Sequence, residues 1–222
     1  VNKTLIGLTF QNNKDGVFNF DNVVVDRCYF IQNGSASNKT SRFISFSGNA
    51  EVKNSKFIKN YGYIELGGST NSFKVNLFQE NIFGNKTNSQ ASRFFWGWTG
   101  RLVIDNNIFL RNGEYVKQSW DGVETGIVGL QGWGDTTYVT NNTFIQNDAV
   151  GVSFTQVNKS AVVVNNLFYK NKADFSFEKY NSGNSQTFVY SNISNNILTK
   201  DLASNENIGS YAYRSDSKDN IY

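Results

Sequence analysis

The chain has 222 residues, a length that suits one or two domains, and its 19 Phe, 11 Tyr and 4 Trp exclude an intrinsically disordered chain. The net charge of +3 comes with scattered lysines and no basic block, and no apolar run reaches the roughly 18 residues that a membrane-spanning helix needs. His is absent and Cys occurs once, which excludes His-dependent catalysis, His metal sites and an internal disulfide. We therefore expect no cofactor, no metal site, no nucleic-acid partner and no membrane insertion in this segment. Because the chain starts with Val and contains no Met, we expect it to be a piece of a longer precursor.

A nine-residue motif, apolar-x-x-small-x-Phe-x-x-Asn, recurs along most of the chain. Its shortest interval is 20 residues and the others are longer by varying amounts, which favours coils with fixed strands and extensible corners over helical repeats. The predicted copies are residues 5–13, 25–33, 52–60, 78–86, 104–112, 139–147, 163–171 and 193–201. Their anchoring residues are Phe10, Phe30, Phe57, Phe83, Phe109, Phe144, Phe168 and Leu198.

A second motif, apolar-small-apolar, follows each anchor except the last. Alternation with a period of two residues is typical of a half-buried strand and incompatible with a helix, whose apolar residues lie three and four apart. The predicted second strands contain residues 18–20, 44–46, 64–66, 96–98, 128–130, 152–154 and 175–177. Trp96 and Trp98 would then face the core, with Gly97 between them on the outer face.

Together the motifs predict an all-β fold, a right-handed parallel β-helix (a single-stranded β-solenoid) of about eight coils. Stacking equivalent strands in parallel buries the Phe and aliphatic columns, and parallel crossovers are right-handed by default. We expect one domain, with the β-helix over residues 1–201 and a polar tail or irregular last coil over residues 202–222.

Two polar columns accompany the strands. The corner asparagines are expected to adopt the left-handed conformation of a sharp bend and to form a hydrogen-bonded ladder: Asn13, Asn33, Asn60, Asn112, Asn147 and Asn171. A second, inner ladder is predicted from Cys28, Ser55, Asn81, Asn107, Asn142, Asn166 and Asn196. Cys28 occupies a small-residue place in it, which indicates a buried spacer.

The repeated F-x-x-N (FQNN, FIQN, FIKN, FLRN, FYKN) resembles the β-helix repeats of adhesin-like surface proteins of methanogenic archaea, and is also similar to those of the chlamydial polymorphic outer-membrane proteins. The chlamydial repeats carry a further G-G-A-[ILV] motif, of which only Gly67-Gly68 is present here. The resemblance covers most of residues 1–201. It implies a large, exported cell-surface protein with many similar coils, and it identifies no ligand.

Enzymes also use this fold, so the strand faces were searched for paired carboxylates. Asp26 and Asp105 share a column but lie three coils apart, about 14 Å by strand spacing, which is too far for paired acid–base work. Glu65 stands alone in its column. We therefore predict no catalytic residue and no enzyme activity on the strands.

The expanded corners after Phe30, Phe83 and Phe109 are expected to cluster along one edge of the rod. The longest segment, 111–125, carries Tyr115, Trp120, Asp121 and Glu124, and Trp133 follows the next strand. Aromatic rings beside carboxylates are typical of sugar sites, so these five residues are the predicted ligand-binding set. The alternatives are that the rings cover hydrophobic surface under a long loop, or that the two acids bind calcium.

Seven N-x-Ser/Thr sequons make glycosylation a hypothesis: Asn2, Asn33, Asn38, Asn85, Asn141, Asn158 and Asn192.

The sequence thus predicts a non-catalytic, extracellular cell-surface module of adhesin-like type that mediates attachment. Its partners would be cell-surface glycans or another envelope protein, and it could stack end to end with further coils of the parent chain. Two alternatives stay open. One is a polysaccharide-active lyase or hydrolase, or its inactive relative, with Asp121, Glu124 or Asp135 as its acids. The other is a structural segment of an envelope or filament.

Overall fold

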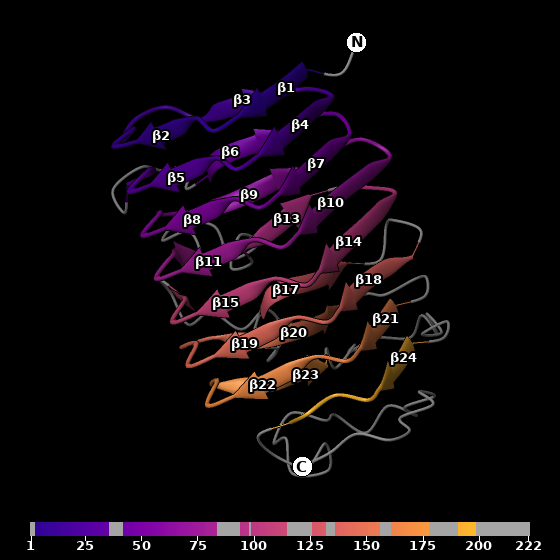
Figure 1. Cartoon of the computed structure of the whole chain (residues 1–222). Coiled ribbons are helices and arrows are strands. Elements are labelled where there is room, and N and C mark those ends of the chain that lie inside the picture. Colours follow the sequence, from indigo (N-terminus) through magenta and orange to yellow (C-terminus); the bar gives the residue numbers. More distant parts are fainter. Residues whose placement is uncertain are drawn as a thin grey trace, which may run out of the picture.

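The computed structural model describes residues 3–35, 42–83, 94–97, 99–114, 126–131, 136–155, 161–177 and 191–198. Every regular element in these ranges is a β-strand, and the strands stack as eight coils of a parallel β-helix (Figure 1). Each complete coil gives one strand to each of three parallel sheets, here named A, B and C in the order in which the chain passes through them. None of these residues forms a helix that could cross a membrane.

The strands of each sheet follow one another in coil order. Sheet A contains β1 (Lys3–Ile6), β4 (Val23–Asp26), β7 (Ala50–Lys53), β10 (Thr70–Lys74), β14 (Arg101–Asp105), β18 (Thr137–Thr140), β21 (Ala161–Val164) and β24 (Ser191–Ser194). Sheet B contains β2 (Thr9–Gln11), β5 (Tyr29–Ile31), β8 (Lys56–Ile58), β11 (Leu77–Gln79), β15 (Ile108–Leu110), β19 (Thr143–Ile145) and β22 (Leu167–Tyr169). Sheet C contains β3 (Phe18–Phe20), β6 (Arg42–Phe46), β9 (Tyr63–Leu66), β13 (Phe95–Gly97), β17 (Gly126–Gln131), β20 (Val150–Thr155) and β23 (Ala173–Phe177). A small parallel pair, β12 (Ile82–Phe83) and β16 (Gly113–Glu114), follows sheet B in coils four and five.

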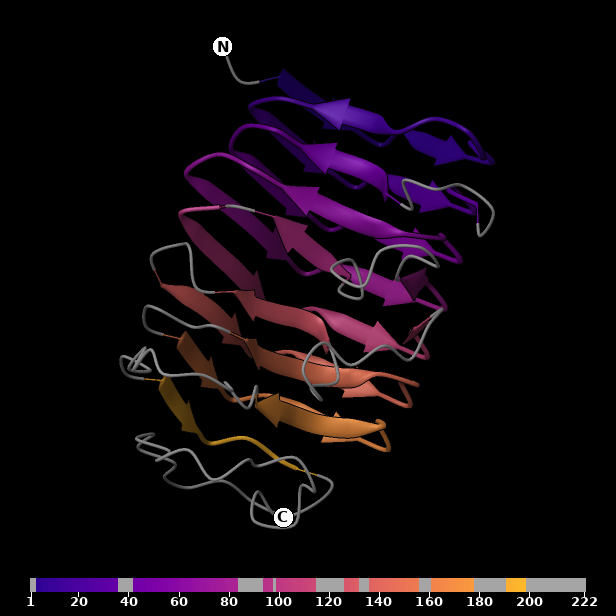
Figure 2. The ribbon, with the colours of Figure 1, turned by 180° about the vertical axis from the view of Figure 1, so that it is seen from behind.

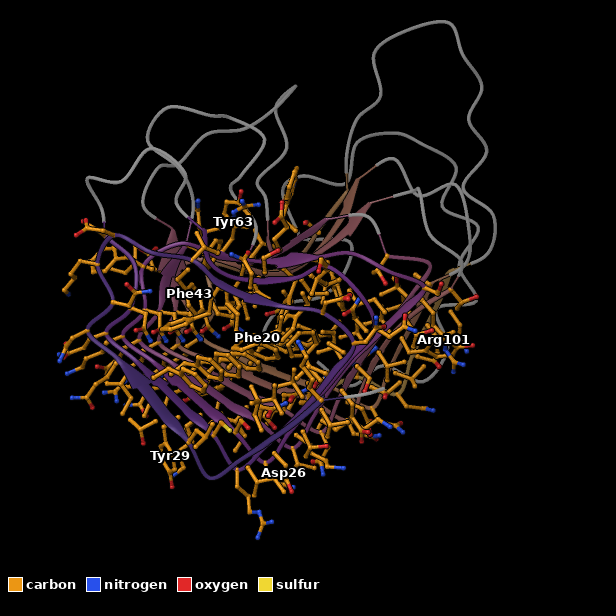
Figure 3. All side chains as sticks on the ribbon, turned by 90° about the horizontal axis from the view of Figure 1, so that it is seen from above. Phe20, Asp26, Tyr29, Phe43, Tyr63 and Arg101 are labelled. Atoms are coloured by element: carbon orange, nitrogen blue, oxygen red, sulfur yellow. The ribbon has the colours of Figure 1, made fainter. Side chains whose placement is uncertain are left out.

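The winding is right-handed. Seen from the N-terminal end, the chain turns clockwise from sheet A through sheet B to sheet C as it moves away from the viewer (Figure 3). Sheets A and B form the two sides of a wedge, and sheet C closes it on the side that faces the viewer in Figure 2. The predicted fold class is therefore confirmed.

A column of seven phenylalanines runs through sheet B and forms the centre of the core: Phe10, Phe30, Phe57, Phe78, Phe109, Phe144 and Phe168. Consecutive rings are stacked with centroids 4.6–4.9 Å apart and interplanar angles of 3–17°. This separation equals the distance between neighbouring strands, so backbone pairing places each ring at a favourable stacking distance from the next.

The predicted anchor of coil four is wrong by five residues. Phe78, not Phe83, pairs with Phe57 on one side and with Phe109 on the other. The motif of this coil is therefore FKVNLFQEN (73–81) rather than residues 78–86. Both segments fit the pattern, because an aromatic residue stands at Phe73, Phe78 and Phe83 alike. Phe83 is also fully buried, but it belongs to β12, where it pairs with Glu114.

Two ladders of buried amides flank this column. In each ladder the Asn Oδ1 accepts a hydrogen bond from the backbone N–H of its neighbour in the preceding coil and, where that neighbour is a buried Asn, a second one from its Nδ2. For example, Asn60 Oδ1 accepts both donors of Asn33 at 3.0 Å, and Asn60 Nδ2 donates to the Phe30 carbonyl at 2.9 Å. The corner ladder is Asn13, Asn33, Asn60, Asn81, Asn112, Asn147 and Asn171. The inner ladder is Cys28, Ser55, Asn76, Asn107, Asn142, Asn166 and Asn196.

The ladders correct two predictions and confirm one. Asn81 belongs to the corner ladder, and Asn76 takes the place predicted for it in the inner ladder. The left-handed residue is not the ladder Asn but the residue before it, such as Lys59 (φ 55°) before Asn60. The ladder side chain must point inward, so the bend falls on its exposed neighbour. Cys28 is fully buried, as predicted, and its N–H donates to Ser55 Oγ at 3.0 Å.

The inner ladder predicts a large cost for truncating one amide. Asn107→Ala removes the acceptor of the Asn76 N–H, one of the two acceptors of the Asn76 Nδ2, and the donor to the Phe73 carbonyl. Because each buried polar group left unpaired costs about 1–3 kcal/mol, we expect the free energy of unfolding to fall by about 3 kcal/mol or more in urea denaturation. The control is Asn106→Gly, in which an exposed side chain is removed and the positive φ of 54° is retained. Equal losses in the two variants would contradict the ladder's role.

Two glycines at the same place in the coil, each directly after a corner-ladder Asn, should respond differently to alanine. A Cβ on Gly34 (φ +76°) would lie 1.9 Å from the Tyr61 carbonyl oxygen, so Gly34→Ala should lower the free energy of unfolding by about 2 kcal/mol or more. A Cβ on Gly113 would meet only the Asp148 Cβ, at 3.8 Å. Gly113→Ala should therefore leave stability unchanged or raise it by up to about 1 kcal/mol. Thermal unfolding of both variants checks the pair, and similar destabilisation of both would refute it.

Candidate functional site

The predicted ligand-binding residues lie outside the described part of the chain. Tyr115, Trp120, Asp121 and Glu124 fall between β16 and β17, and Trp133 falls between β17 and β18, as does the candidate acid Asp135.

The corners that carry these segments follow a pattern. Segments 36–41, 84–93 and 115–125 each connect sheet B to sheet C, in coils two, four and five, so their ends meet the rod along one edge, as predicted. Segments 132–135, 156–160 and 178–190 connect sheet C to sheet A, in coils five to seven. Sheet C is therefore bordered on both edges by the variable corners of the rod.

Three glycosylation candidates lie on described residues. Asn141 and Asn192 are exposed, but Asn33 is fully buried, and its Nδ2 donates to Phe10 O at 2.9 Å and to Asn60 Oδ1 at 3.0 Å. The folded coil leaves no room for a glycan on Asn33, so this candidate is withdrawn. Asn2, Asn38, Asn85 and Asn158 lie outside the described residues.

The strand around Trp96 corrects a core prediction. In β13, Phe95 pairs with Ile64 and fills the inward position, so Trp96 pairs with Glu65 and faces outward, only partly buried. Gly97 takes the place next to Leu66, where a Cβ would lie 2.0 Å from the Leu66 carbonyl oxygen. Trp98 lies outside the described residues. The predicted register is wrong by one residue, because the run Phe94-Phe95-Trp96 has an apolar residue at every position.

On the outer face of coils two to four, sheet C carries five side chains that we call the sheet C cluster: Arg42, Ser45, Tyr63, Glu65 and Trp96. Arg42 Nη1 forms an ion pair with Glu65 Oε2, and Ser45 Oγ donates to the same oxygen at 2.8 Å. The Tyr63 ring meets Trp96 edge to face, with centroids 5.5 Å apart and an interplanar angle of 69°.

A β-bulge in β6 brings Arg42 into the cluster. The pairing with β9 shifts between Arg42 and Ile44, so the extra residue Phe43 is absorbed and both Phe43 and Ile44 are fully buried. Arg42 and Ser45 consequently both face outward, beside Tyr63 and Glu65. In Figure 3, Phe43 lies inside the rod and Tyr63 lies on the outer side of sheet C. Bulges commonly re-aim side chains next to functional sites.

Burial shapes the electrostatics of the cluster. Burial raises the pKa of the Tyr63 phenol above its usual value, the neighbouring Glu65 carboxylate raises it further, and Arg42 opposes both effects. Within the described residues, the buried Nε of Arg42 has no hydrogen-bond partner. This donor is closed to solvent, so a ligand could meet the guanidinium only through the Nη nitrogens of the partly exposed side chain.

Neighbouring side chains hold three further carboxylates, those of Asp26, Asp105 and Glu80. Asp26 and Asp105 lie in one column of sheet A with Lys53 and Lys74 between them, so the predicted three-strand separation is confirmed. Asn54 Nδ2 donates to Asp26 at 2.8 Å, and this hydrogen bond is the largest influence that lowers the pKa of Asp26.

The carboxylates of Asp105 and Glu80 also interact with neighbouring side chains. Asp105 accepts from Thr140 at 2.6 Å and from Asn141 at 2.8 Å. Glu80 lies 2.8 Å from Arg111 and is held further by Gln79, whose hydrogen bond lowers the pKa of Glu80 most. Across the described ranges, His, Cys, Asp and Glu side chains form no group of three that could hold a metal ion.

No protein-family model, curated protein or solved structure matches the chain. The site must therefore be interpreted from its own geometry.

Sequence reasoning found Glu65 but missed Arg42, Tyr63 and the outward position of Trp96. One signal was available for Arg42. The consecutive apolar residues Phe43 and Ile44 break the alternation of the strand, and an extra residue in an alternating pattern is what a bulge produces.

The raised pKa of Tyr63 predicts a specific loss of stability in alkali. Below pH 10, the phenol is neutral in the folded and unfolded chains alike, whereas at higher pH the unfolded chain can lose this proton more readily. The stability that the neutral Tyr63 phenol contributes is therefore fully present below the pKa that this phenol has in the unfolded chain. It is lost as the pH rises through the higher pKa of the phenol in the folded chain. The difference in unfolding free energy between the wild type and Tyr63→Phe, measured from pH 7 to 11, should shift in favour of Tyr63→Phe only above about pH 10. Glu65→Gln should weaken this shift, and parallel curves for the wild type and Tyr63→Phe would disprove it.

Proposed function

We propose that this β-helix is a non-catalytic recognition module of adhesin-like type, displayed at a cell surface, which attaches to carbohydrate through the outer face of sheet C. The observation that carries the proposal is the outward position of Trp96 beside the Arg42–Glu65 ion pair. An aromatic face next to fixed hydrogen-bonding groups is the combination that sugar sites use, because a sugar ring has apolar faces and a polar rim.

The scaffold supports this assignment in two ways. All five residues of the cluster lie on or beside paired strands, so their backbone positions are set by the stacked coils rather than by a loop. A site on rigid strands loses little conformational freedom when its ligand binds. Sheet C also borders the corner that carries Tyr115 and Trp120, so those predicted residues belong to the same proposal.

The test is a glycan-array screen of the purified chain beside Trp96→Ala. Specific binding of the wild type, weakened at least tenfold in Trp96→Ala, is the expected result, and tenfold corresponds to about 1.4 kcal/mol of binding free energy. Tyr169→Ala is the matched control, since Tyr169 is an exposed aromatic residue on sheet B, away from the cluster. Circular dichroism confirms that each variant is folded.

The remaining outcomes separate the alternatives. Binding that survives in Trp96→Ala but is lost in Trp120→Ala or Tyr115→Ala would move the site to the loops. Cleavage of a bound oligosaccharide would favour the polysaccharide-active alternative. An array without any bound glycan would refute carbohydrate attachment.

A second candidate function is structural, through end-to-end stacking with further coils of the parent chain or with another envelope protein. The observation that favours it is the apolar side of coil one that faces away from coil two. Leu5, Phe10, Phe18 and Phe20 pack against the core but remain only partly buried. Reversible self-association in sedimentation experiments, without glycan binding, would favour this candidate.

A further inference from the structure

The charges of the sheet C cluster cancel within the cluster. Arg42 is the single cation and Glu65 the single anion, and they are paired with each other. Apart from Glu65, the central outward column of sheet C has only uncharged residues among those described: Asn19, Ser45, Trp96, Gly129 and Ser153. A ligand at Trp96 therefore meets an ion pair and not a net positive field.

The surroundings of Trp96 differ on its two sides. Towards coil three lie Glu65 and Tyr63, whose ring is inclined at 69° to the Trp96 ring with centroids 5.5 Å apart. Towards coil five the neighbour in the column is Gly129, which has no side chain and is itself partly exposed. No column neighbour covers that side of the indole, and one strand spacing, about 4.8 Å, separates the two backbones there.

We propose, on the basis of the function proposed above, that the cluster binds a neutral pyranose and discriminates against acidic sugars. The apolar face of the ring lies on Trp96 over Gly129. Its hydroxyls bridge the ion pair: the partly exposed side chain of Arg42 donates to a hydroxyl oxygen through an Nη, and Glu65 accepts from a neighbouring hydroxyl. Each hydroxyl is both donor and acceptor, so a pair of adjacent hydroxyls can satisfy both members of an ion pair without separating them.

An acidic sugar lacks this complementarity. A sugar carboxylate or sulfate cannot donate to Glu65, and it repels that carboxylate. An anion that accepts from the second Nη of Arg42 places another negative charge beside Glu65, and an anion that takes Nη1 from Glu65 leaves a partly buried carboxylate with Ser45 as its one remaining described partner. Removing a hydrogen-bonded partner from a buried charge is a strong source of discrimination between ligands.

The test compares matched oligosaccharides that differ only at C6. The probes are hexamers of β-1,4-mannose, β-1,4-glucose and α-1,4-galactose, each beside its C6-carboxylate counterpart, with affinity measured by calorimetry at fixed ionic strength. We expect at least one neutral hexamer to bind, at least tenfold more tightly than its acidic counterpart, and Trp96→Ala to abolish that binding.

The Glu65→Gln variant tests the cause of the selectivity. It keeps the shape of the side chain at this position but removes the carboxylate that neutralises Arg42. The preference for the neutral hexamer should therefore shrink by at least threefold or reverse. A merely misfolded variant would lose both ligands equally. Arg42→Gln should weaken the neutral ligand and increase its preference over the acidic one, because it removes the one cation of the cluster and leaves the Glu65 carboxylate to repel the anion.

The outcomes separate this inference from the function on which it rests. An acidic hexamer that binds as tightly as its neutral counterpart, or more tightly, overturns the inference and leaves carbohydrate recognition standing. Selectivity that is unchanged in Glu65→Gln overturns the ion-pair explanation. If no hexamer binds and the glycan array is also empty, both the inference and the proposed function fail.

Discussion

In-register parallel stacking is the constraint on which the rest of this structure depends. Because each strand lies directly above its equivalent, one residue type per coil becomes a continuous column, and the spacing of the column is the spacing of the backbone. For phenylalanine, the result is a stack with centroids 4.6–4.9 Å apart. For asparagine, the result is a chain of amides in which the Nδ2 of every internal Asn donates to a backbone carbonyl of the preceding coil and to the Asn Oδ1 of the following coil, as Asn60 does. A single substitution therefore affects three coils at once.

The two ladders also explain how the coil can turn so sharply. Each ladder residue follows a residue with φ between 52° and 59°, and none of these preceding residues is glycine. A left-handed residue other than glycine costs roughly 1 kcal/mol, and even Val75 adopts this conformation. The ladder amide next to it satisfies the backbone groups that the bend removes from the sheets. Strain in the corner is thus offset by hydrogen bonds in the core, and the side chain of the strained residue is free to be Lys, Glu or Arg.

More of the fold than of the candidate site could be predicted from the sequence. The Phe and Asn columns were predictable because a nine-residue pattern recurs with one residue of each kind per coil. The errors arose where the pattern is ambiguous: Phe73, Phe78 and Phe83 are five residues apart, so two registers fit coil four, and only strand pairing selects Phe78. Phe94, Phe95 and Trp96 gave the same ambiguity in sheet C, and the one-residue slip turned an outward Trp into a predicted core residue. Arg42 was missed because its partner Glu65 is 23 residues away, and their contact depends on a bulge.

The same constraint decides where a binding site can evolve on this scaffold. Sheet A connects to sheet B through two residues in every coil, and the second of them is the inner-ladder residue or, in coil one, Leu8. An insertion there would interrupt the ladder and expose its amides, so that corner cannot vary. The corners on either side of sheet C lie outside the inner ladder, and all of the longer connections occur at these two corners. Sheet C is therefore the one sheet with segments free to change in length at both of its edges, whereas sheets A and B each have them at one edge. Trp96 and the Arg42–Glu65 pair lie on this face, where a ligand would contact both the constant and the variable parts of the molecule.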